Sequence, residues 1–177
     1  MRRAALLALA GLLLIACEGT EPTVPDPVLP GATGFFSPLP GAVQTQGFGC
    51  TSFALEPWAP ECPGRHFHAG VDLAGFPEGT PVLAAAGGLV AAVRFDQRGY
   101  GNYMVVDHGH GLSTLYAHLQ GADLKAGDPV FRGFRLGRLG STGMSTGPHL
   151  HFEVRTDGRP VDPELFLPAV HLRGGSP

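Results

Sequence analysis

Two histidines separated by one residue stand near the end of the chain, in the segment His-Leu-His-Phe-Glu at 149–153. Polar and apolar residues alternate from His149 to Val154, which predicts a β-strand. Because alternate side chains of a strand point to opposite faces, His149, His151 and Glu153 should share one face. The apolar side chains between them should pack on a core. Two imidazoles on one face could bind a metal or transfer protons, and the alternative is a pair of surface histidines without a role.

A second segment, His-Ala-Gly-Val-Asp at 68–72, has the same alternation. In an extended conformation His68, Gly70 and Asp72 face one way, and we expect the glycine to leave room for a small divalent cation. Imidazole and carboxylate form a common catalytic zinc set, with three protein ligands and one position open for water. The two segments together predict a site made of His68, Asp72 and one histidine of the segment 149–153, with the other histidine close to the metal.

A third histidine, His118, ends an apolar-rich segment that contains Tyr-Ala-His-Leu at 116–119. The three motifs, in this order, resemble those of the LytM/lysostaphin-type zinc metallopeptidases, the M23 peptidase family. The resemblance extends from about Phe48 to Pro163. It includes loops of the family, at which this chain has Gly79-Thr80-Pro81-Val82, Gly99-Tyr100-Gly101-Asn102 and Gly140-Ser141-Thr142-Gly143.

Carried over residue by residue, the resemblance implies that His68, Asp72 and His151 bind Zn²⁺ and that His118 and His149 are the catalytic histidines. It implies hydrolysis of peptide bonds in the stem peptides or cross-bridges of bacterial peptidoglycan. Together with the composition, it implies a mainly β domain of the LytM kind, a single antiparallel sheet or sandwich with short strands and long loops. No residue of the set departs from the family's pattern.

The expected chemistry follows from such a set. Zinc would lower the pKa of a bound water to about 7 and polarise the scissile carbonyl. His118 or His149 could accept the proton of the water or donate to the developing oxyanion, because an imidazole titrates near neutrality. For Glu153 we expect a solvated surface carboxylate, and the alternative is a carboxylate that orients an imidazole.

Two other functions are compatible with the motifs. One is a non-catalytic lipoprotein that binds peptidoglycan or activates a separate amidase, although the complete set of ligands and histidines argues against it. The other is a different zinc hydrolase of cell-wall peptides, such as a carboxypeptidase.

Residues 1–16 have the features of an export signal, with two arginines followed by an apolar run of 13 residues that is too short for a lasting membrane span. The run ends in Leu-Ile-Ala-Cys, which resembles the bacterial lipobox and implies cleavage before Cys17 and lipidation of this cysteine. The alternative is an ordinary secretory signal with a chance cysteine. We therefore expect an exported protein that is lipid-anchored to the cell envelope, facing the periplasm or the exterior.

Residues 17–34 should form a semi-stiff linker, because four prolines stand there among small and polar residues. The peptidase domain is expected at 35–168 and a flexible tail at 169–177. The chain carries a net charge of −3, with one lysine and eleven scattered arginines, so it lacks the charge footprint of a nucleic-acid binder. The 27 glycines and 17 prolines favour a loop-rich β fold.

Cys50 and Cys62 are the remaining cysteines, and a disulfide between them is expected in an exported chain. Closing so short a loop contributes roughly 3 kcal/mol in the chain-entropy model. The bond would clamp the segment that leads to His68. A cysteine ligand to zinc is the alternative. His66 shares the alternation of His68 and is expected at the rim of the site.

From residue 81 the chain alternates between short apolar segments and turns. Strands are expected at 81–85, 88–95, 102–107, 112–118, 128–131 and 136–139, with one possible helical turn within 121–127. His108 and His110 flank a turn and should be solvated. The glycine-rich loop 140–147 lacks the Gly-Lys-Ser/Thr ending and the helix of a phosphate loop, and the resemblance implies a place beside the substrate groove. The core candidates are Val105, Val106, Leu112, Leu115 and Tyr116.

Overall fold

The computed structural model describes residues 34–167. The expected signal segment, Cys17, most of the linker and the tail lie outside the described residues. Within this range no helix combines the length and the hydropathy that a membrane span requires.

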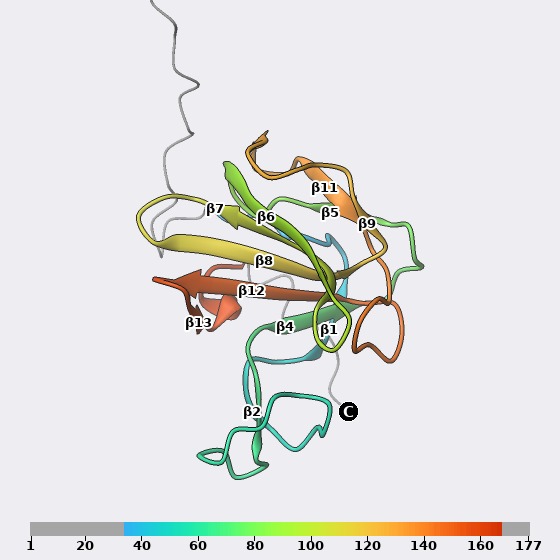
Figure 1. The fold of residues 1–177 in the computed structure, drawn as a ribbon, viewed down its shortest axis with the longest axis vertical. Helices are drawn as coiled ribbons and strands as arrows, with labels where there is room; N and C mark the ends of the chain where they lie inside the picture. Colours follow the sequence, from blue (N-terminus) through green and yellow to red (C-terminus); the bar gives the residue numbers. More distant parts are fainter. Residues whose placement is uncertain (1–33, 168–177) are drawn as a thin grey trace, which may run out of the picture.

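Almost all regular structure in residues 34–167 is β (Figure 1). The one exception is a single 3-10 turn, η1, at Pro163–Leu165. The strands are β1 (Val43–Gln46), β2 (Gly49–Thr51), β3 (His66–His68), β4 (Val71–Ala74), β5 (Pro81–Leu83), β6 (Gly88–Asp96), β7 (Gly101–Asp107), β8 (Leu112–Leu119), β9 (Gly121–Ala122), β10 (Pro129–Val130), β11 (Arg135–Arg138), β12 (Leu150–Thr156) and β13 (Arg159–Val161).

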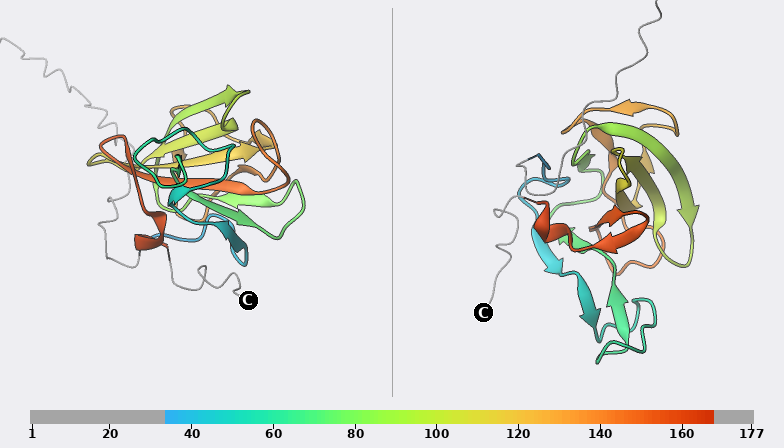
Figure 2. Two further views of the ribbon diagram at one scale, coloured as in Figure 1. Left: turned by 90° about the horizontal axis from the view of Figure 1, so that it is seen from below. Right: turned by 90° about the vertical axis from the view of Figure 1, so that its left-hand side faces the viewer.

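The strands form three antiparallel sheets (Figures 1 and 2). The largest has eight strands, in the order β1-β4-β12-β8-β7-β6-β10, with β13 paired to the other end of β12. A three-stranded sheet has the order β5-β11-β9, and β2 and β3 form a separate pair. The prediction of a mainly β, antiparallel domain is confirmed.

The core consists of apolar side chains from the large sheet and from the three-stranded sheet. β12 contributes Leu150, Phe152 and Val154, as its alternation predicts, and β5 and β11 contribute Val82 and Leu136. Among the core candidates, Val105 is only half-buried and the prediction for it is wrong. Its neighbours Met104 and Val106 on β7 point to the opposite face, into the core.

The segment 68–72 is not one continuous strand. β3 ends at His68 and β4 begins at Val71, with a break between them. A Cβ atom on Gly70 would lie 2.3 Å from the carbonyl oxygen of Phe152 in β12. The glycine therefore allows close approach of two backbones, and the expectation that it makes room for a metal is wrong. The possible helical turn within 121–127 is absent as well, since β9 occupies its start.

His108 is completely buried, so the prediction that it is solvated is wrong. Its Nδ1–H donates to the carbonyl of Gly87 (2.7 Å), and its Nε2 lies 2.8 Å from the hydroxyl of Thr114. The hydroxyl of Tyr116 lies 2.9 Å from that of Thr114 and accepts from the amide of Ala85. Burial lowers the pKa of His108, although Gly87 and the nearby Asp107 oppose this.

A disulfide joins Cys50 and Cys62, whose Cα atoms are 5.3 Å apart. It closes a loop that follows β2 and returns to β3. In Figure 1 this part of the chain projects from the lower end of the large sheet. We call residues 50–62 the disulfide loop.

Candidate metal centre and active-site groove

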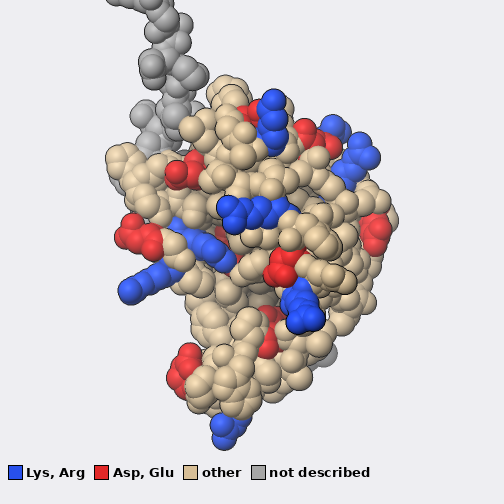
Figure 3. All heavy atoms as spheres, viewed as in Figure 1, with Lys and Arg blue, Asp and Glu red and all other residues tan. Residues whose placement is uncertain are grey.

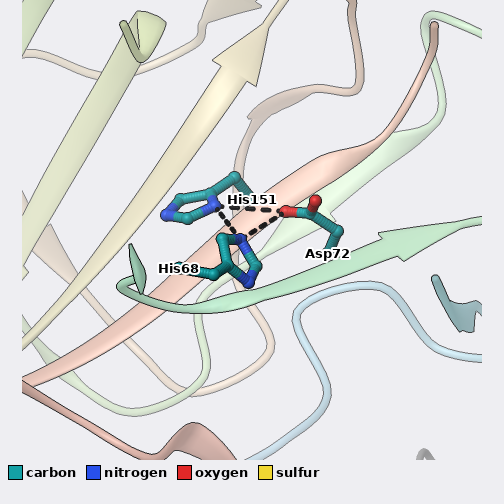
Figure 4. Close-up of side chains that lie close together, drawn as sticks. All are labelled: His68, Asp72 and His151. Carbon is teal, nitrogen blue, oxygen red and sulfur yellow. Dashed lines mark hydrogen bonds and ion pairs between the residues drawn. The ribbon is translucent and has the colours of Figure 1, made fainter. Parts of the chain in front are cut away.

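Three side chains from separate strands meet at one point (Figure 4). The antiparallel register of β12 and β4 places His151 directly opposite Asp72, and His68 stands at the end of β3. His151 Nδ1 lies 2.9 Å from His68 Nε2 and 3.1 Å from Asp72 Oδ1, and the last two atoms are 3.2 Å apart. Within residues 34–167 this is the group whose atoms lie close enough to hold a metal ion.

Hydrogen bonds on the outer side of each imidazole direct a lone pair to this point. Nδ1–H of His68 donates to the carbonyl of Gly47 (2.8 Å), so Nε2 is left to face Asp72. In its neutral form His151 donates Nε2–H to Glu153 Oε1 (3.0 Å), so Nδ1 faces the same point. Three acceptors at such short distances repel one another unless a cation lies among them. Ligands roughly 2.0–2.1 Å from a tetrahedral zinc are about 3.3 Å apart, so the donor set fits Zn²⁺.

The electrostatic surroundings also favour a positive charge. Burial disfavours the protonated form of His151, but hydrogen bonds with Asp72 and Glu153 outweigh this and raise its pKa to about 9. For Asp72, burial raises the pKa, but His151 and His68 outweigh this and hold it well below its usual range. Any cation, a proton or a metal ion, is therefore stabilised between these groups.

Glu153 is completely buried, so the expectation of a solvated carboxylate is wrong. Besides His151, it accepts hydrogen bonds from Arg155 Nε (2.5 Å) and from the hydroxyl of Tyr100 (2.6 Å). Burial alone would raise its pKa, but these hydrogen bonds lower it. The pKa of Tyr100 is raised by its own burial and by Glu153, so Tyr100 keeps its proton as a donor. Glu153 is thus an ionised carboxylate that fixes the ring of His151.

His118 and His149 lie beside the cluster, with their ring centroids 4.6 Å apart. Nδ1–H of His118 donates to the carbonyl of Thr142 (2.8 Å), and that of His149 donates to the carbonyl of Gly147 (2.9 Å). In both rings Nε2 is therefore the atom left for proton exchange, and in His149 it lies 3.8 Å from Asp72 Oδ1. Burial lowers the pKa of His118 to about 4, against the effect of Thr142. His118 is neutral at pH 7.

These side chains line a groove of about 900 Å³. The disulfide loop forms one wall, the turn between β6 and β7 contributes a second, and the loop 144–148 a third. The lining residues around the metal cluster are Glu56, Asp72, Tyr100, His118, His149 and His151. The glycine-rich loop thus borders the groove, where the resemblance implied that it would lie.

The structure brings the five predicted site residues together: His68, Asp72, His118, His149 and His151. His66 is half-buried and donates Nδ1–H to the carbonyl of Glu56 (2.6 Å), away from the cluster. Cys50 and Cys62 are bonded to each other, so neither is a ligand.

Sequence reasoning missed Tyr100 and Arg155. Arg155 could have been found, because it continues the alternation of His151 and Glu153 along the same face of β12. Tyr100 stands in one of the loops that resemble the family, but nothing in the sequence indicates that its hydroxyl reaches Glu153.

Residues 66–163 match the family model described as Peptidase family M23. This chain is a member of the M23 peptidase family. The DD-carboxypeptidase/endopeptidase Mpg of Neisseria meningitidis serogroup B is 47% identical over 106 residues, which make up 59% of this chain and 24% of that protein. The peptidoglycan DD-endopeptidase ShyA of Vibrio cholerae is 45% identical over 95 residues, or 54% of this chain and 22% of that protein.

Among solved structures, a zinc containing peptidase from Vibrio cholerae has a TM-score of 0.61 and 38% identity, and the match covers 73% of this chain and 39% of that one. The M23 chain described here spans about a quarter of the length of the curated relatives named above.

Proposed function

We propose that this M23 chain is a zinc-dependent endopeptidase that hydrolyses peptide bonds in peptidoglycan stem peptides or cross-bridges. The observation that carries the proposal is the convergence of three metal-directed lone pairs and two further histidines in one groove. The names of two relatives also support it, since one is called a DD-carboxypeptidase/endopeptidase and the other a peptidoglycan DD-endopeptidase. On the face drawn in Figure 3, acidic and basic side chains are interspersed.

His68, Asp72 and His151 would hold the zinc, and Zn²⁺ in such a set polarises a carbonyl and activates water. His118 is suited to accept the proton of the attacking water at Nε2, because its ring is neutral and its Nδ1–H is bound to Thr142. In its protonated form His149, with Nδ1–H bound to Gly147, would donate Nε2–H to the oxyanion that develops on the scissile carbonyl.

The test is digestion of purified peptidoglycan by the purified protein, followed by mass spectrometry of the fragments. Cleavage within a cross-link that a chelator stops and added zinc restores is the expected result. Release of single terminal residues would instead indicate a carboxypeptidase, an activity that also appears in the name of the Neisseria relative. Zinc-loaded protein that releases no fragment would contradict the proposal and favour a binding or amidase-activating role.

A matched pair of variants accompanies this experiment. His151→Ala removes a proposed ligand and should abolish cleavage and stoichiometric zinc binding. His110→Asn changes an exposed histidine on a turn and should retain both. Asparagine tolerates the positive φ of 51° at this position.

We further propose that the protein is exported and anchored to the envelope by lipid on Cys17, with the linker as a spacer between membrane and substrate. The apolar segment that ends at Cys17 supports this part of the proposal. Incorporation of labelled palmitate and partition into detergent should both be lost in Cys17→Ala. Equal labelling of the two proteins would contradict the anchor without affecting the proposed peptidase.

A further inference from the structure

The disulfide loop reaches into the groove with a charged side chain. Five consecutive residues of this loop, 53–57, line the groove, and Glu56 is the one among them that carries a charge. Its side chain is only 16% exposed. Glu56 thus brings a largely buried negative charge close to His68, one of the proposed zinc ligands.

Four sets of contacts fix the backbone at Glu56. Its amide donates to the carbonyl of Phe53 (3.1 Å), which closes a turn. Its carbonyl accepts from His66 Nδ1 (2.6 Å), and the next carbonyl, of Pro57, accepts from the amide of Phe67 (3.1 Å). The disulfide ties the loop to β2. Since His66 and Phe67 belong to β3, the strand that ends in His68 also holds Glu56.

The carboxylate itself is oriented toward the cluster. Gln46 Nε2 donates to Glu56 Oε1 (3.1 Å), and the same oxygen lies 3.9 Å from His68 Nε2. Glu56 is not in the group whose ligand atoms all lie within 4.8 Å of one another, so Oε1 stands beside the three proposed ligands and not among them. Glu56 approaches the cluster at His68, His149 approaches it at Asp72, and both side chains line the same groove.

We propose that Glu56 is a further catalytic residue, whose carboxylate accepts a hydrogen bond from the water that attacks the peptide bond and thereby orients it. This inference rests on the proposed peptidase function. It makes the disulfide loop a part of the catalytic machinery, with Gln46 as a positioning residue that acts through Glu56. The negative charge of Glu56 would also strengthen the binding of Zn²⁺ at His68, Asp72 and His151.

The test compares Glu56→Gln with Glu61→Gln, an exposed glutamate of the same loop. Both variants are assayed for peptidoglycan cleavage and for zinc affinity in competition with a chromogenic chelator. For Glu56→Gln we expect kcat to fall about 10- to 100-fold with KM changed less than about 3-fold, and zinc affinity to fall about 10-fold. Glu61→Gln should match the wild type in all three quantities.

Unchanged kcat in Glu56→Gln, with an active wild type, would overturn the proposal and leave the peptidase function standing. If the wild type itself releases no fragments, the proposed peptidase function is contradicted. The zinc affinities, measured in competition with the chromogenic chelator, then still test whether the carboxylate of Glu56 faces the bound Zn²⁺. Equal zinc affinities of the wild type and Glu56→Gln would then overturn the proposal for Glu56.

A second variant tests the path through Gln46. Gln46→Met keeps the length of the side chain and removes the donor to Glu56. It should lower kcat in the wild-type background and have no effect in the Glu56→Gln background, because the two side chains act as one unit. Equal losses in both backgrounds would show that Gln46 acts independently and would overturn its role. Thermal unfolding of each variant verifies that the fold is retained.

Discussion

Glu153 and His151 stand two residues apart on the same face of β12, and the carboxylate Oε1 of one lies 3.0 Å from the imidazole Nε2 of the other. The carboxylate is completely buried and also accepts hydrogen bonds from Arg155 and Tyr100. The orientation of the imidazole, and with it the atom that faces the metal cluster, is therefore determined by a neighbour on the same strand. Tyr100 connects this pair to the wall of the groove.

Glu153→Gln should weaken zinc affinity about 10- to 100-fold, because the amide can still accept from His151 but no longer carries the charge that strengthens this ligand. Cleavage at limiting zinc should fall in proportion. Competition with a chromogenic chelator measures the affinity, and Glu61→Gln, which changes an exposed carboxylate, is the control. Equal zinc affinities of Glu153→Gln and the wild type would contradict the orienting role.

Alternation along the chain predicted β12 and placed His151 and Glu153 on one of its faces, whereas the segment 68–72 is divided between two strands. This succeeds for β12 because a strand's period of two depends only on local backbone geometry. The same reasoning could not decide between His149 and His151 as the ligand. That choice depends on the register of β12 against β4, which pairs His151 with Asp72 and is a relation between distant segments.

The predictions for Glu153, His108 and Gly70 are wrong for one reason, which is that each residue contacts segments distant in the sequence. Glu153 and His108 are polar residues that sequence reasoning assigns to solvent, yet each is buried with partners from other elements. At Gly70 a side chain would collide with the backbone of Phe152, which stands 82 residues later in β12. Such neighbours leave no trace in the local sequence, so alternation alone could not predict that these polar side chains are buried.

Replacing the two unligated histidines should separate catalysis from metal binding. His118→Asn and His149→Ala should each lower kcat about 10²- to 10⁴-fold, the usual contribution of a positioned acid or base. Bound zinc should remain stoichiometric, because neither ring belongs to the cluster. Asparagine is chosen at position 118 because the backbone φ is +58° there, a conformation that it tolerates. Loss of zinc from either variant would contradict this division.

The disulfide should contribute roughly 3 kcal/mol to the free energy of unfolding, from the restricted conformations of the unfolded loop. The double variant Cys50→Ser, Cys62→Ser should show this decrease in urea unfolding, measured with a chelator present so that zinc binding does not contribute. A reducing agent should lower the stability of the wild type by a similar amount and leave that of the variant unchanged. A wild type that is insensitive to reduction would contradict the prediction.

The buried His108 should make stability depend on pH. Burial lowers its pKa in the folded state, so between that value and the unfolded value of about 6.5 the unfolded chain binds more protons. Its contribution to stability is therefore complete above pH 6.5 and is lost as the pH falls below it, by at most about 1.4 kcal/mol per pH unit. His108→Gln removes this titration, and His110→Asn, at an exposed histidine, should keep it. Urea unfolding from pH 8 to pH 5, with a chelator in all samples, should show a steeper decline for the wild type and His110→Asn than for His108→Gln. Parallel curves for all three proteins would contradict the prediction.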